Sequence, residues 1–451
     1  MSYCIDAFGE YDIRGIYPQT INKEIAYRIG RFFPILFKAK KVVIGNDIRL
    51  SGPALKTALM KGLTESGCDV VDIGQCGTEM IYFATVHLGL DGGIMVTASH
   101  NPKEYNGMKL VSQNAQPISR DTGLKKLKAQ VFDAKLPTKT EPVGNVKKID
   151  ITEEYVKYIL SYVDIKEIKP FKVVINSGNG AAGPILDVME KYLPFEFVKI
   201  HHKPDGRFPN GVPNPLLVEN RDATANAVVA SQADVGVAWD GDFDRCFMFD
   251  ENGNFIESYY LVGFLAEFFL QKEPGGRIIY DPRLTWNTEE VVKKNGGISI
   301  MSKSGHAFIK DTMRKEDAVY GGEMSAHHYF KDFSYCDSGM IPWLLVLNLL
   351  SKVKGKSFSD MMKERIRRYP ISGEINIKSA NPDEVLERIE AEFRTKGNIT
   401  KIDGLSVELE EWRFNLRKSN TESLLRLNVE TRHNNALLKH VTEDLLTLIS
   451  K

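Results

Sequence analysis

The sequence predicts an α/β protein built from three similar domains, followed by a fourth, α+β domain at the C-terminal end. The chain has 451 residues, and single hydrophobic cores stop growing near ~250–300 residues. An apolar run at residues 41–45, a helical pattern over 54–66 and a second apolar run at 68–73 follow one another. Such alternation is typical of parallel sheets covered by helices. Strand patterns restart at residues 172–176 and 277–280, which predicts three domains of one kind.

The spacing of apolar residues predicts the first helix and the last domain. Apolar side chains recur at helical spacing between residues 21 and 36, which is typical of an amphipathic helix. Near the C-terminal end, residues 406–409 and 412–416 alternate apolar and polar side chains, residues 424–429 do so less regularly, and a helical pattern covers 436–449. Alternation indicates half-buried antiparallel strands, so this part of the chain is predicted to be α+β.

We place the domain boundaries where these patterns change. A polar, proline-containing segment at residues 136–148 is the expected first linker, and we expect it to run into the next helix. The glycine-rich stretch SGNGAAG lacks the spacing of a nucleotide-binding loop and is interpreted as a strand-to-helix turn. The predicted domains span residues 1–147, 148–254, 255–369 and 370–451.

Composition and charge narrow the function classes. Lys plus Arg and Asp plus Glu number 59 each, and the formal net charge of +0 argues against a nucleic-acid-binding surface. The N-terminal residues show no signal pattern, and the apolar stretch around 340–350 is shorter than the ~20 residues of a membrane span. The five cysteines form no CxxC pair, which favours reduced thiols. We therefore expect a cytoplasmic monomer or homodimer that binds neither nucleic acid nor membrane.

The stretch TASHNP places Ser99 just after a predicted buried strand at residues 92–96. Small and polar residues follow the strand, and Pro102 ends the loop. A rigid strand that delivers a side chain at its carboxyl end is a common way for α/β proteins to build a site. The alternative is a solvated serine in a turn, and the other polar loops of the chain decide between the two.

A second polar loop, DGDFDR, follows a predicted strand at residues 234–239. Asp240, Asp242 and Asp244 offer hard oxygen ligands, which suit a divalent cation such as Mg²⁺. Arg245 excludes an EF-hand, because it occupies the position that requires glycine and a strand pattern follows it. The remaining alternative is an acidic hairpin turn, although three unpaired carboxylates are costly unless a cation relieves them.

Two further polar loops offer groups that suit a phosphorylated sugar. GEMSAHH, at residues 322–328, contains the mixture of donors and acceptors that sugar hydroxyls require. RKSNTES, at residues 417–423, combines a guanidinium group with hydroxyls and loop amides, which suits a phosphate. Taken alone, each loop is more simply interpreted as a polar connection between strands.

The four loops, in this order and at this spacing, closely resemble the active-site loops of the α-D-phosphohexomutases. YDIRG, NGMKL and SGHAFIK belong to the same resemblance, which covers essentially the whole chain. The sugar loop GEMSAHH resembles that of the bacterial phosphomannomutase branch. The resemblance implies three mixed-sheet α/β domains and a C-terminal α+β domain around a central cleft, with one of the four loops contributed by each domain.

The resemblance also implies a role for each loop. Ser99 would carry the phosphoryl group as a phosphoserine, and Asp240, Asp242 and Asp244 together with Ser99 would hold one Mg²⁺. Arg245 would either orient the phosphoserine or neutralise charge. A hexose 1,6-bisphosphate would be both the intermediate and the activator that primes Ser99. The implied substrate-binding residues are Glu323, Ser325, His327, Arg283, Arg417, Ser419, Asn420, Thr421 and Arg426.

The general acid and base are left open between two candidates. By motif position these are Lys109 and His306, with Arg14 and Arg283 as charge partners. Histidine is an obvious proton carrier, whereas a lysine serves only when its pKa is lowered. Lys109 is equally well interpreted as a cation that contacts phosphate and transfers no proton.

The expected activity is the reversible conversion of mannose 6-phosphate and mannose 1-phosphate, which supplies GDP-mannose synthesis. A dual mannose and glucose mutase is the next alternative, because these sugars differ only at C2. The alternative from another class is a non-catalytic protein that binds sugar phosphates. The complete set of Ser99, the three aspartates and Arg417 argues against that alternative.

Overall fold

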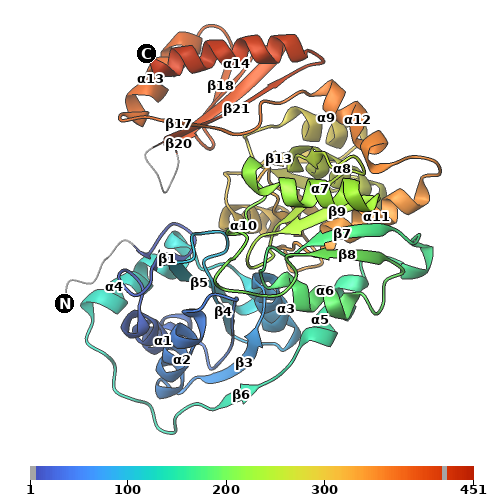
Figure 1. Ribbon diagram of the computed structural model, residues 1–451. Helices are drawn as coiled ribbons and strands as arrows, with labels where there is room; N and C mark the ends of the chain where they lie inside the picture. The colour runs from blue at the N-terminus through green and yellow to red at the C-terminus, as the bar shows by residue number, and fades with distance from the viewer. Residues whose placement is uncertain (1–6, 419–423) are drawn as a thin grey trace. The chain divides into compact units, whose positions relative to one another are not determined.

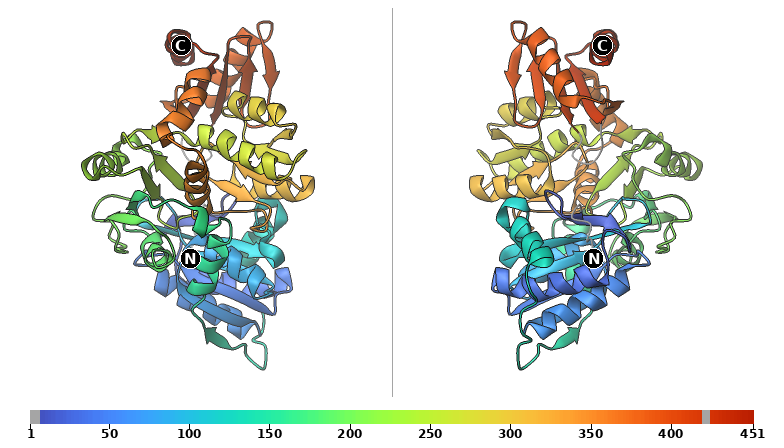
Figure 2. Two further views of the ribbon diagram at one scale, coloured as in Figure 1. Left: turned by 90° about the vertical axis from the view of Figure 1, so that its right-hand side faces the viewer. Right: turned by 90° about the vertical axis from the view of Figure 1, so that its left-hand side faces the viewer.

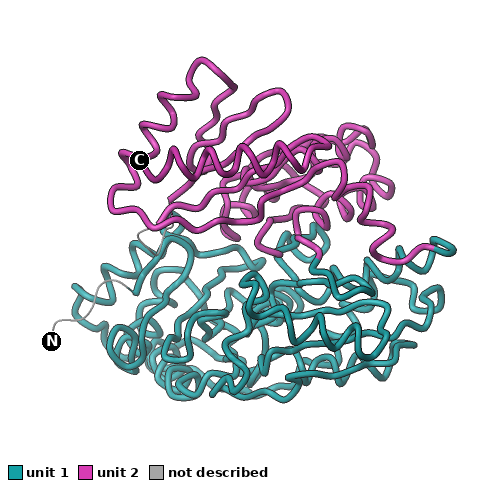
Figure 3. Tube along the Cα trace, turned by 45° about the horizontal axis from the view of Figure 1, so that its top comes forward, with its two compact units in different colours: residues 1–255, 327–355 teal, residues 256–326, 356–451 magenta. Residues whose placement is uncertain are grey.

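The computed structural model describes residues 7–418 and 424–451, and the chain divides into two compact units (Figure 3). Unit 1 comprises residues 1–255 and 327–355, and unit 2 comprises residues 256–326 and 356–451. The chain therefore leaves unit 1, returns to it for one short segment, and ends in unit 2.

Unit 1 begins with a six-stranded mixed sheet in the order β1-β5-β4-β2-β3-β6 (Figure 1). Its strands are β1 (Ile13–Ile16), β2 (Lys41–Asn46), β3 (Asp69–Gln75), β4 (Gly92–Val96), β5 (Tyr105–Ser112) and β6 (Val146–Lys148). Strands β2, β3, β4 and β6 pair in parallel, whereas β5 lies antiparallel to β1 and β4. Parallel neighbours need crossover connections, which α2 (Gly52–Glu65) and α3 (Thr78–His87) supply.

Helices cover both faces of this sheet (Figures 1 and 2). Val42 and Ile44 of β2 belong to a core shared with α1 (Lys23–Phe37), α2 and α4 (Lys125–Asp133). Val43 points to the opposite face because side chains alternate along a strand, and there it lies near Ile81 of α3. Strand β2 is thus buried on both faces.

The second sheet repeats this plan in the order β11-β10-β9-β7-β8. Its strands are β7 (Lys172–Asn176), β8 (Glu196–Ile200), β9 (Val235–Trp239), β10 (Cys246–Phe249) and β11 (Phe255–Ile256). β7 pairs in parallel with β8 and β9, and β10 returns antiparallel to β9. The accompanying helices are α5 (Thr152–Leu160), α6 (Ala182–Met189) and α7 (Asp222–Ser231).

The next elements are divided between the two units. In unit 2, β12 (Arg277–Tyr280) pairs in parallel with β13 (Ile298–Met301) and β14 (Tyr320–Gly322). The helices of this part are α8 (Ser258–Lys272), α9 (Trp286–Lys294), α10 (His306–Glu316) and α12 (Phe358–Arg368). In unit 1, β15 (His328–Phe330) pairs antiparallel with β16 (Cys336–Asp337), and the largely buried helix α11 (Ile341–Lys352) follows.

The C-terminal part of unit 2 is an antiparallel sheet in the order β17-β21-β20-β19-β18. Its strands are β17 (Ile375–Lys378), β18 (Asn398–Thr400), β19 (Leu405–Glu408), β20 (Trp412–Lys418) and β21 (Leu424–Thr431). Alternate apolar residues of β19, β20 and β21 form one core with α13 (Pro382–Phe393) and α14 (Asn435–Ser450). Asn434 caps α14 by accepting a hydrogen bond from the Leu437 N–H at 2.9 Å.

The predicted fold class is confirmed, with mixed α/β sheets first and an antiparallel α+β sheet last. One expectation is wrong in detail: the segment 136–148 does not run straight into a helix, because its last three residues form β6 and pair with β3. All three residues of β6 are exposed, so no apolar pattern marks this strand. Among the described residues, no helix is long and apolar enough to cross a membrane, and Cys68, Cys76, Cys246 and Cys336 are free thiols.

Candidate active site

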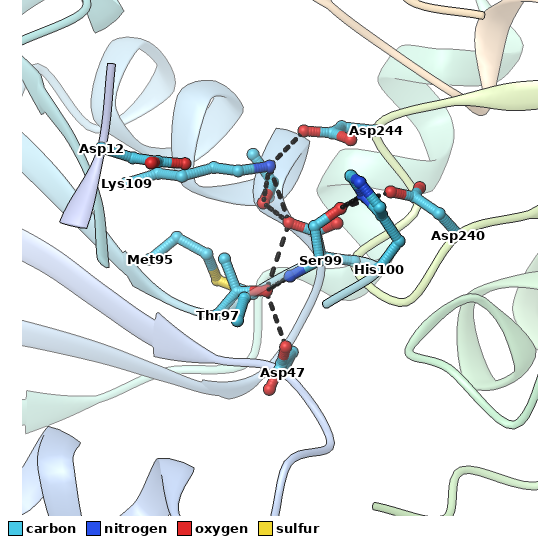
Figure 4. Close-up of polar contacts among 12 residues, drawn as sticks. Asp12, Asp47, Met95, Thr97, Ser99, His100, Lys109, Asp240 and Asp244 are labelled. Carbon is cyan, nitrogen blue, oxygen red and sulfur yellow. Dashed lines mark hydrogen bonds and ion pairs between the residues drawn. The ribbon is translucent and has the colours of Figure 1, made fainter. Parts of the chain in front are cut away.

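Ser99 lies in the loop after β4, and the residue is only 2% exposed. Its φ of 47° is in the left-handed region, which a residue with a side chain adopts only where its surroundings hold it. The Ser99 N–H donates to Thr97 Oγ1 at 2.9 Å, and Ser99 Oγ donates to Asp240 Oδ2 at 2.5 Å (Figure 4). The loop therefore turns the Ser99 hydroxyl towards the acidic loop, residues 240–245.

The acidic loop connects β9 and β10, and its three carboxylates converge. Asp240, Asp242 and Asp244 are buried, and one oxygen of each lies within 4.8 Å of the others. Within the described part of the chain, Oδ1 of each aspartate has no hydrogen-bond partner. Buried acceptors are rarely left in this state, and converging carboxylate oxygens are the ligands that hard divalent cations prefer. The residues present therefore fit a metal ion.

Gly241 lets the acidic loop approach the Ser99 loop closely. A Cβ atom at this position would lie 2.6 Å from the carbonyl oxygen of Ser99. Any larger residue would push the two loops apart. The glycine between the first two aspartates is therefore part of the geometry of the site.

Lys109, on β5, brings positive charge to the acidic loop (Figure 4). Its Nζ atom lies 2.8 Å from Asp242 Oδ2 and also contacts Asp244 Oδ2. Burial opposes the charged ammonium, yet attraction by the two carboxylates outweighs burial and raises the pKa of Lys109. At Asp242, burial is likewise outweighed by Lys109, and the pKa falls below its usual value. At Asp244, burial and the Asp242 charge raise the pKa well above its usual value.

Arg245 and His100 complete the surroundings of the Ser99 hydroxyl. Arg245 Nε donates to Asp240 Oδ2 at 3.0 Å, and its Nη2 donates to Ser99 Oγ at 3.4 Å and contacts His100 Nδ1. His100 Nδ1 lies 3.1 Å from Ser99 Oγ. Burial and then the Arg245 charge lower the pKa of His100 well below its usual value, which favours the neutral imidazole. A phosphoryl group on Ser99 would meet the guanidinium group of Arg245.

Arg14 and Thr78 border the same centre. Arg14 Nη1 donates to Asn101 Oδ1 at 2.5 Å, next to the Ser99 loop. Thr78 Oγ1, at the start of α3, donates to Asp242 Oδ2 at 2.5 Å. The predicted charge partner Arg14 thus lies in unit 1 with Ser99, Lys109 and the acidic loop.

Sequence reasoning missed Asp47 and Arg49, which bind the Ser99 loop through hydrogen bonds. Thr97 Oγ1 donates to Asp47 Oδ2 at 2.6 Å, and Arg49 Nη2 donates to the Ser99 carbonyl oxygen at 2.9 Å. Asp47 and Arg49 follow β2, which pairs in parallel with β4. Since parallel strands end at the same sheet edge, charged residues directly after β2 were a usable signal.

In unit 2, the predicted sugar-binding residues Glu323, Ser325 and Arg283 lie together. Arg283 Nη2 is 3.4 Å from both Glu323 Oε1 and Ser325 Oγ. Glu323 Oε1 also accepts a hydrogen bond from the Gly305 N–H at 2.8 Å. The next residue is His306, the first residue of α10. This candidate base therefore directly follows the residue whose N–H binds Glu323.

His327, expected to bind sugar, belongs to unit 1. Its Nε2 atom lies 3.7 Å from Asp244 Oδ1 and 3.7 Å from Asp337 Oδ2. The imidazole therefore lies beside the acidic loop, which its position in the motif did not indicate. Its contact with a sugar stays a prediction.

The predicted phosphate site contains an excess of positive charge. Arg417 on β20 and Arg426 on β21 occupy directly paired positions. Each guanidinium lies 3.3 Å from the Glu374 carboxylate, and Arg283 Nη1 lies 3.9 Å from it. Arg283 is already paired with Asp281 at 2.8 Å and with Glu323 at 3.4 Å, so Arg417 and Arg426 are left to share Glu374. Like charges on paired strands repel, and this pair of arginines therefore suits a further anion. Ser419, Asn420 and Thr421 lie outside the described residues.

All four domains of one protein family match this chain in order. The family is described as phosphoglucomutase/phosphomannomutase, with three alpha/beta/alpha domains and a C-terminal domain. The matches cover residues 6–137 for domain I, 153–253 for domain II, 257–369 for domain III and 374–448 for the C-terminal domain.

Proteins with curated names are similar over the whole length. A phosphomannomutase of Escherichia coli is 54% identical over 454 residues, which cover 99% of each chain. A protein named phosphohexose mutases, from Xanthomonas campestris pv. campestris, is 53% identical over 446 residues, again 99% of each chain. The crystal structure of a phosphoglucomutase/phosphomannomutase family protein from Burkholderia thailandensis superposes with a TM-score of 0.89 at 32% identity, covering 99% of this chain and 97% of that one.

Proposed function

The chain belongs to the phosphoglucomutase/phosphomannomutase family, and we propose that it is a phosphomannomutase. It would convert mannose 6-phosphate and mannose 1-phosphate reversibly through a phosphoserine enzyme and mannose 1,6-bisphosphate, and so supply GDP-mannose synthesis. The observation that carries the proposal is the hydrogen bond of 2.5 Å from Ser99 Oγ to Asp240 within three converging aspartates. A nucleophilic hydroxyl and a candidate metal site are thereby adjacent.

Each side chain around Ser99 has a task in this proposal. Asp240, Asp242 and Asp244 would hold Mg²⁺ together with an oxygen of phosphorylated Ser99, and Mg²⁺ when bound supplies positive charge for phosphoryl transfer. In that transfer the bond between Ser99 Oγ and phosphorus breaks, and Oγ keeps the electron pair and takes up a proton. A sugar hydroxyl oxygen forms the new bond to phosphorus, and its proton passes to a base. Arg245 neutralises the charge of the transferred group from its place beside Ser99 Oγ.

Residues of the predicted sugar and phosphate loops are proposed to bind the sugar phosphate. Glu323 and Ser325 would bind sugar hydroxyls, with His327 as a further contact. The phosphate that does not react would lie among Arg283, Arg417, Arg426 and the loop residues Ser419, Asn420 and Thr421. Guanidinium and hydroxyl groups recognise a phosphate whichever carbon carries it, which suits an intermediate that must turn end over end.

We favour His306 over Lys109 as the proton carrier. Lys109 Nζ contacts two carboxylates of the acidic loop, which suits a charge-neutralising role, whereas His306 follows the residue that binds Glu323. His306→Asn is expected to lower kcat and remove one limb of its pH profile. An unchanged pH profile would transfer the role to another residue.

A dual mannose and glucose mutase is the second candidate, and it is favoured by the broader name of the Xanthomonas relative. The Ser99 hydroxyl, the three aspartates and Arg245 lie together, which argues against a non-catalytic binding protein. Mutase activity on mannose 1-phosphate and glucose 1-phosphate, measured in parallel with Mg²⁺ and a trace of hexose 1,6-bisphosphate, tests all three. A strong mannose preference supports the phosphomannomutase, equal rates support the dual enzyme, and inactivity on both supports the binding protein.

A further inference from the structure

Arg49 lies outside the expected catalytic set, yet it is bonded to the Ser99 loop at several points. The residue is 1% exposed. Its Nη1 donates to the carbonyl oxygens of Pro102 at 2.7 Å and Tyr105 at 2.8 Å, and its Nη2 donates to those of Ser99 at 2.9 Å and Asn101 at 2.5 Å. One guanidinium group thus satisfies four carbonyls of the segment that begins at the proposed nucleophile.

The chemistry of this contact requires arginine. A guanidinium presents five N–H donors in a rigid planar fork, whereas a lysine ammonium is a single point with three donors. Buried carbonyls need hydrogen-bond partners, and here they belong to a loop in which Ser99 has the unfavourable φ of 47°. Asp47 Oδ2 lies 3.4 Å from Arg49 Nε and also accepts from Thr97 Oγ1 at 2.6 Å. The pair of Asp47 and Arg49 therefore fixes the loop on both sides of Ser99.

Phe208, from the second domain, packs against the guanidinium group of Arg49. The centre of its ring lies 5.3 Å from the guanidinium carbon of Arg49, within the range of a cation–π contact. Phe208 is 6% exposed and has a φ of 50°. Nearby, a Cβ atom on Gly206 would lie 2.2 Å from the Ile48 carbonyl oxygen, so the backbone around Gly206 packs directly on the residues that precede Arg49.

The segment that carries Phe208 is also tied to the acidic loop. Asp205 N–H donates to the Asn179 carbonyl oxygen, and Asn210 Nδ2 donates to Asn179 Oδ1, both at 2.9 Å. Two residues further on, the Ala181 N–H donates to the Gly241 carbonyl oxygen at 3.0 Å. A chain of contacts therefore runs from the acidic loop through the glycine-rich turn and Phe208 to Arg49 and the Ser99 loop.

We propose that Arg49 is a positioning residue which, supported by Phe208, fixes the Ser99 hydroxyl against the acidic loop for phosphoryl transfer. This inference rests on the function proposed above. Arg49 touches the loop backbone and not the Ser99 hydroxyl, so it acts through Ser99. Phosphoryl transfer depends on alignment of the reacting atoms, and a misplacement of about 1 Å costs up to about a hundredfold in rate.

Two variants and one matched control test the proposal in the full-length, Mg²⁺-loaded enzyme. Arg49→Lys keeps the charge and loses the fork, and Phe208→Leu keeps an apolar side chain and loses the ring. We expect kcat to fall by about tenfold to a hundredfold in the first and less in the second, with KM within about twofold. The control is Arg207→Lys, whose side chain is 77% exposed and pairs only with Asp205 among the described residues, and it should leave kcat unchanged.

A double variant separates positioning from a general loss of structure. If Phe208 acts through Arg49, Phe208→Leu should lower kcat in the natural chain and have little further effect in the Arg49→Lys background. Equal losses in both backgrounds, or a full kcat in Arg49→Lys, would overturn the inference. If Arg49→Lys does not fold, a full kcat in Phe208→Leu overturns it instead. Ser99→Ala, measured alongside, separates failure of the Arg49 inference from failure of the proposed function, because activity in that variant would refute the proposed function itself.

Discussion

Replacing Lys109 by methionine should destabilise the protein in the absence of metal and much less in its presence. Lys109 is buried, 5% exposed, and its Nζ contacts Asp242 and Asp244. Removing one partner of a buried ion pair leaves uncompensated charge and costs about 3–5 kcal/mol. A loss of 1 kcal/mol lowers Tm by about 2–4 °C in domains of 150–250 residues. We therefore expect Lys109→Met to lower Tm by about 6–20 °C in a chelating buffer.

Saturating Mg²⁺ should restore most of that loss, because the cation would neutralise the same two carboxylates. The assay is thermal unfolding of the natural chain and Lys109→Met, each in EDTA and in Mg²⁺. The matched control is Lys139→Met, whose ion pair with Glu65 is on the surface with the lysine side chain 59% exposed, and which should change stability by at most about 1 kcal/mol in either buffer. Equal losses for Lys109→Met with and without Mg²⁺ would refute the assignment of the acidic loop as a metal site.

Three further perturbations test the proposed phosphate site and one buried carboxyl group. Arg417→Ala should raise KM about tenfold to a hundredfold, the value of a lost charge-assisted hydrogen bond, and an unchanged KM would place the phosphate elsewhere. Glu374→Gln removes the carboxylate that lies among three guanidinium groups, so inorganic phosphate should inhibit up to about fivefold more strongly, the equivalent of ~1 kcal/mol; weaker inhibition would contradict this. Burial raises the pKa of Glu79, which binds the Tyr155 hydroxyl and the Gly339 N–H, from 4.5 to about 8. Between these two pH values the folded protein holds a proton on Glu79 that the unfolded chain has lost. The contribution of Glu79 to the free energy of unfolding is therefore lost as pH rises from 4.5 towards 8. Urea titrations of Glu79→Gln should show a smaller decline, and an unchanged decline would assign it to another group.

Local patterns predicted the regular elements because these depend on side-chain burial. The apolar runs that predicted strands at 92–96 and 172–176 coincide with β4 and β7. The run between residues 21 and 36 lies within a helix from Lys23 to Phe37, apart from its first residues. β6 escaped prediction because its exposed residues contribute only backbone hydrogen bonds to the edge of the sheet.

The sequence motifs predicted the residues that would contact the reacting groups. They did not predict the residues, such as Arg49 and Glu374, that contact those residues from other parts of the chain. Ser99 and the acidic loop share unit 1, and Glu323, Ser325 and Arg283 share unit 2. Arg49 donates to backbone carbonyls that lie 50 to 56 positions away, and its place directly after β2 was the one local signal of this contact. Glu374 precedes β17, and its place among the arginines depends on strand pairing. The roles of the site residues, the cytoplasmic location and the oligomeric state stay predictions.

The proposed mechanism requires Ser99 to carry the transferred phosphate. The most direct measurement is the intact mass of the purified protein, natural chain and Ser99→Ala, after incubation with Mg²⁺ and a hexose 1,6-bisphosphate. We predict one added phosphoryl group on the natural chain, localised to Ser99 by peptide mapping and lost on addition of hexose monophosphate, and no added mass on Ser99→Ala. A phosphoryl group on another residue, or full mutase activity in Ser99→Ala, would contradict the account.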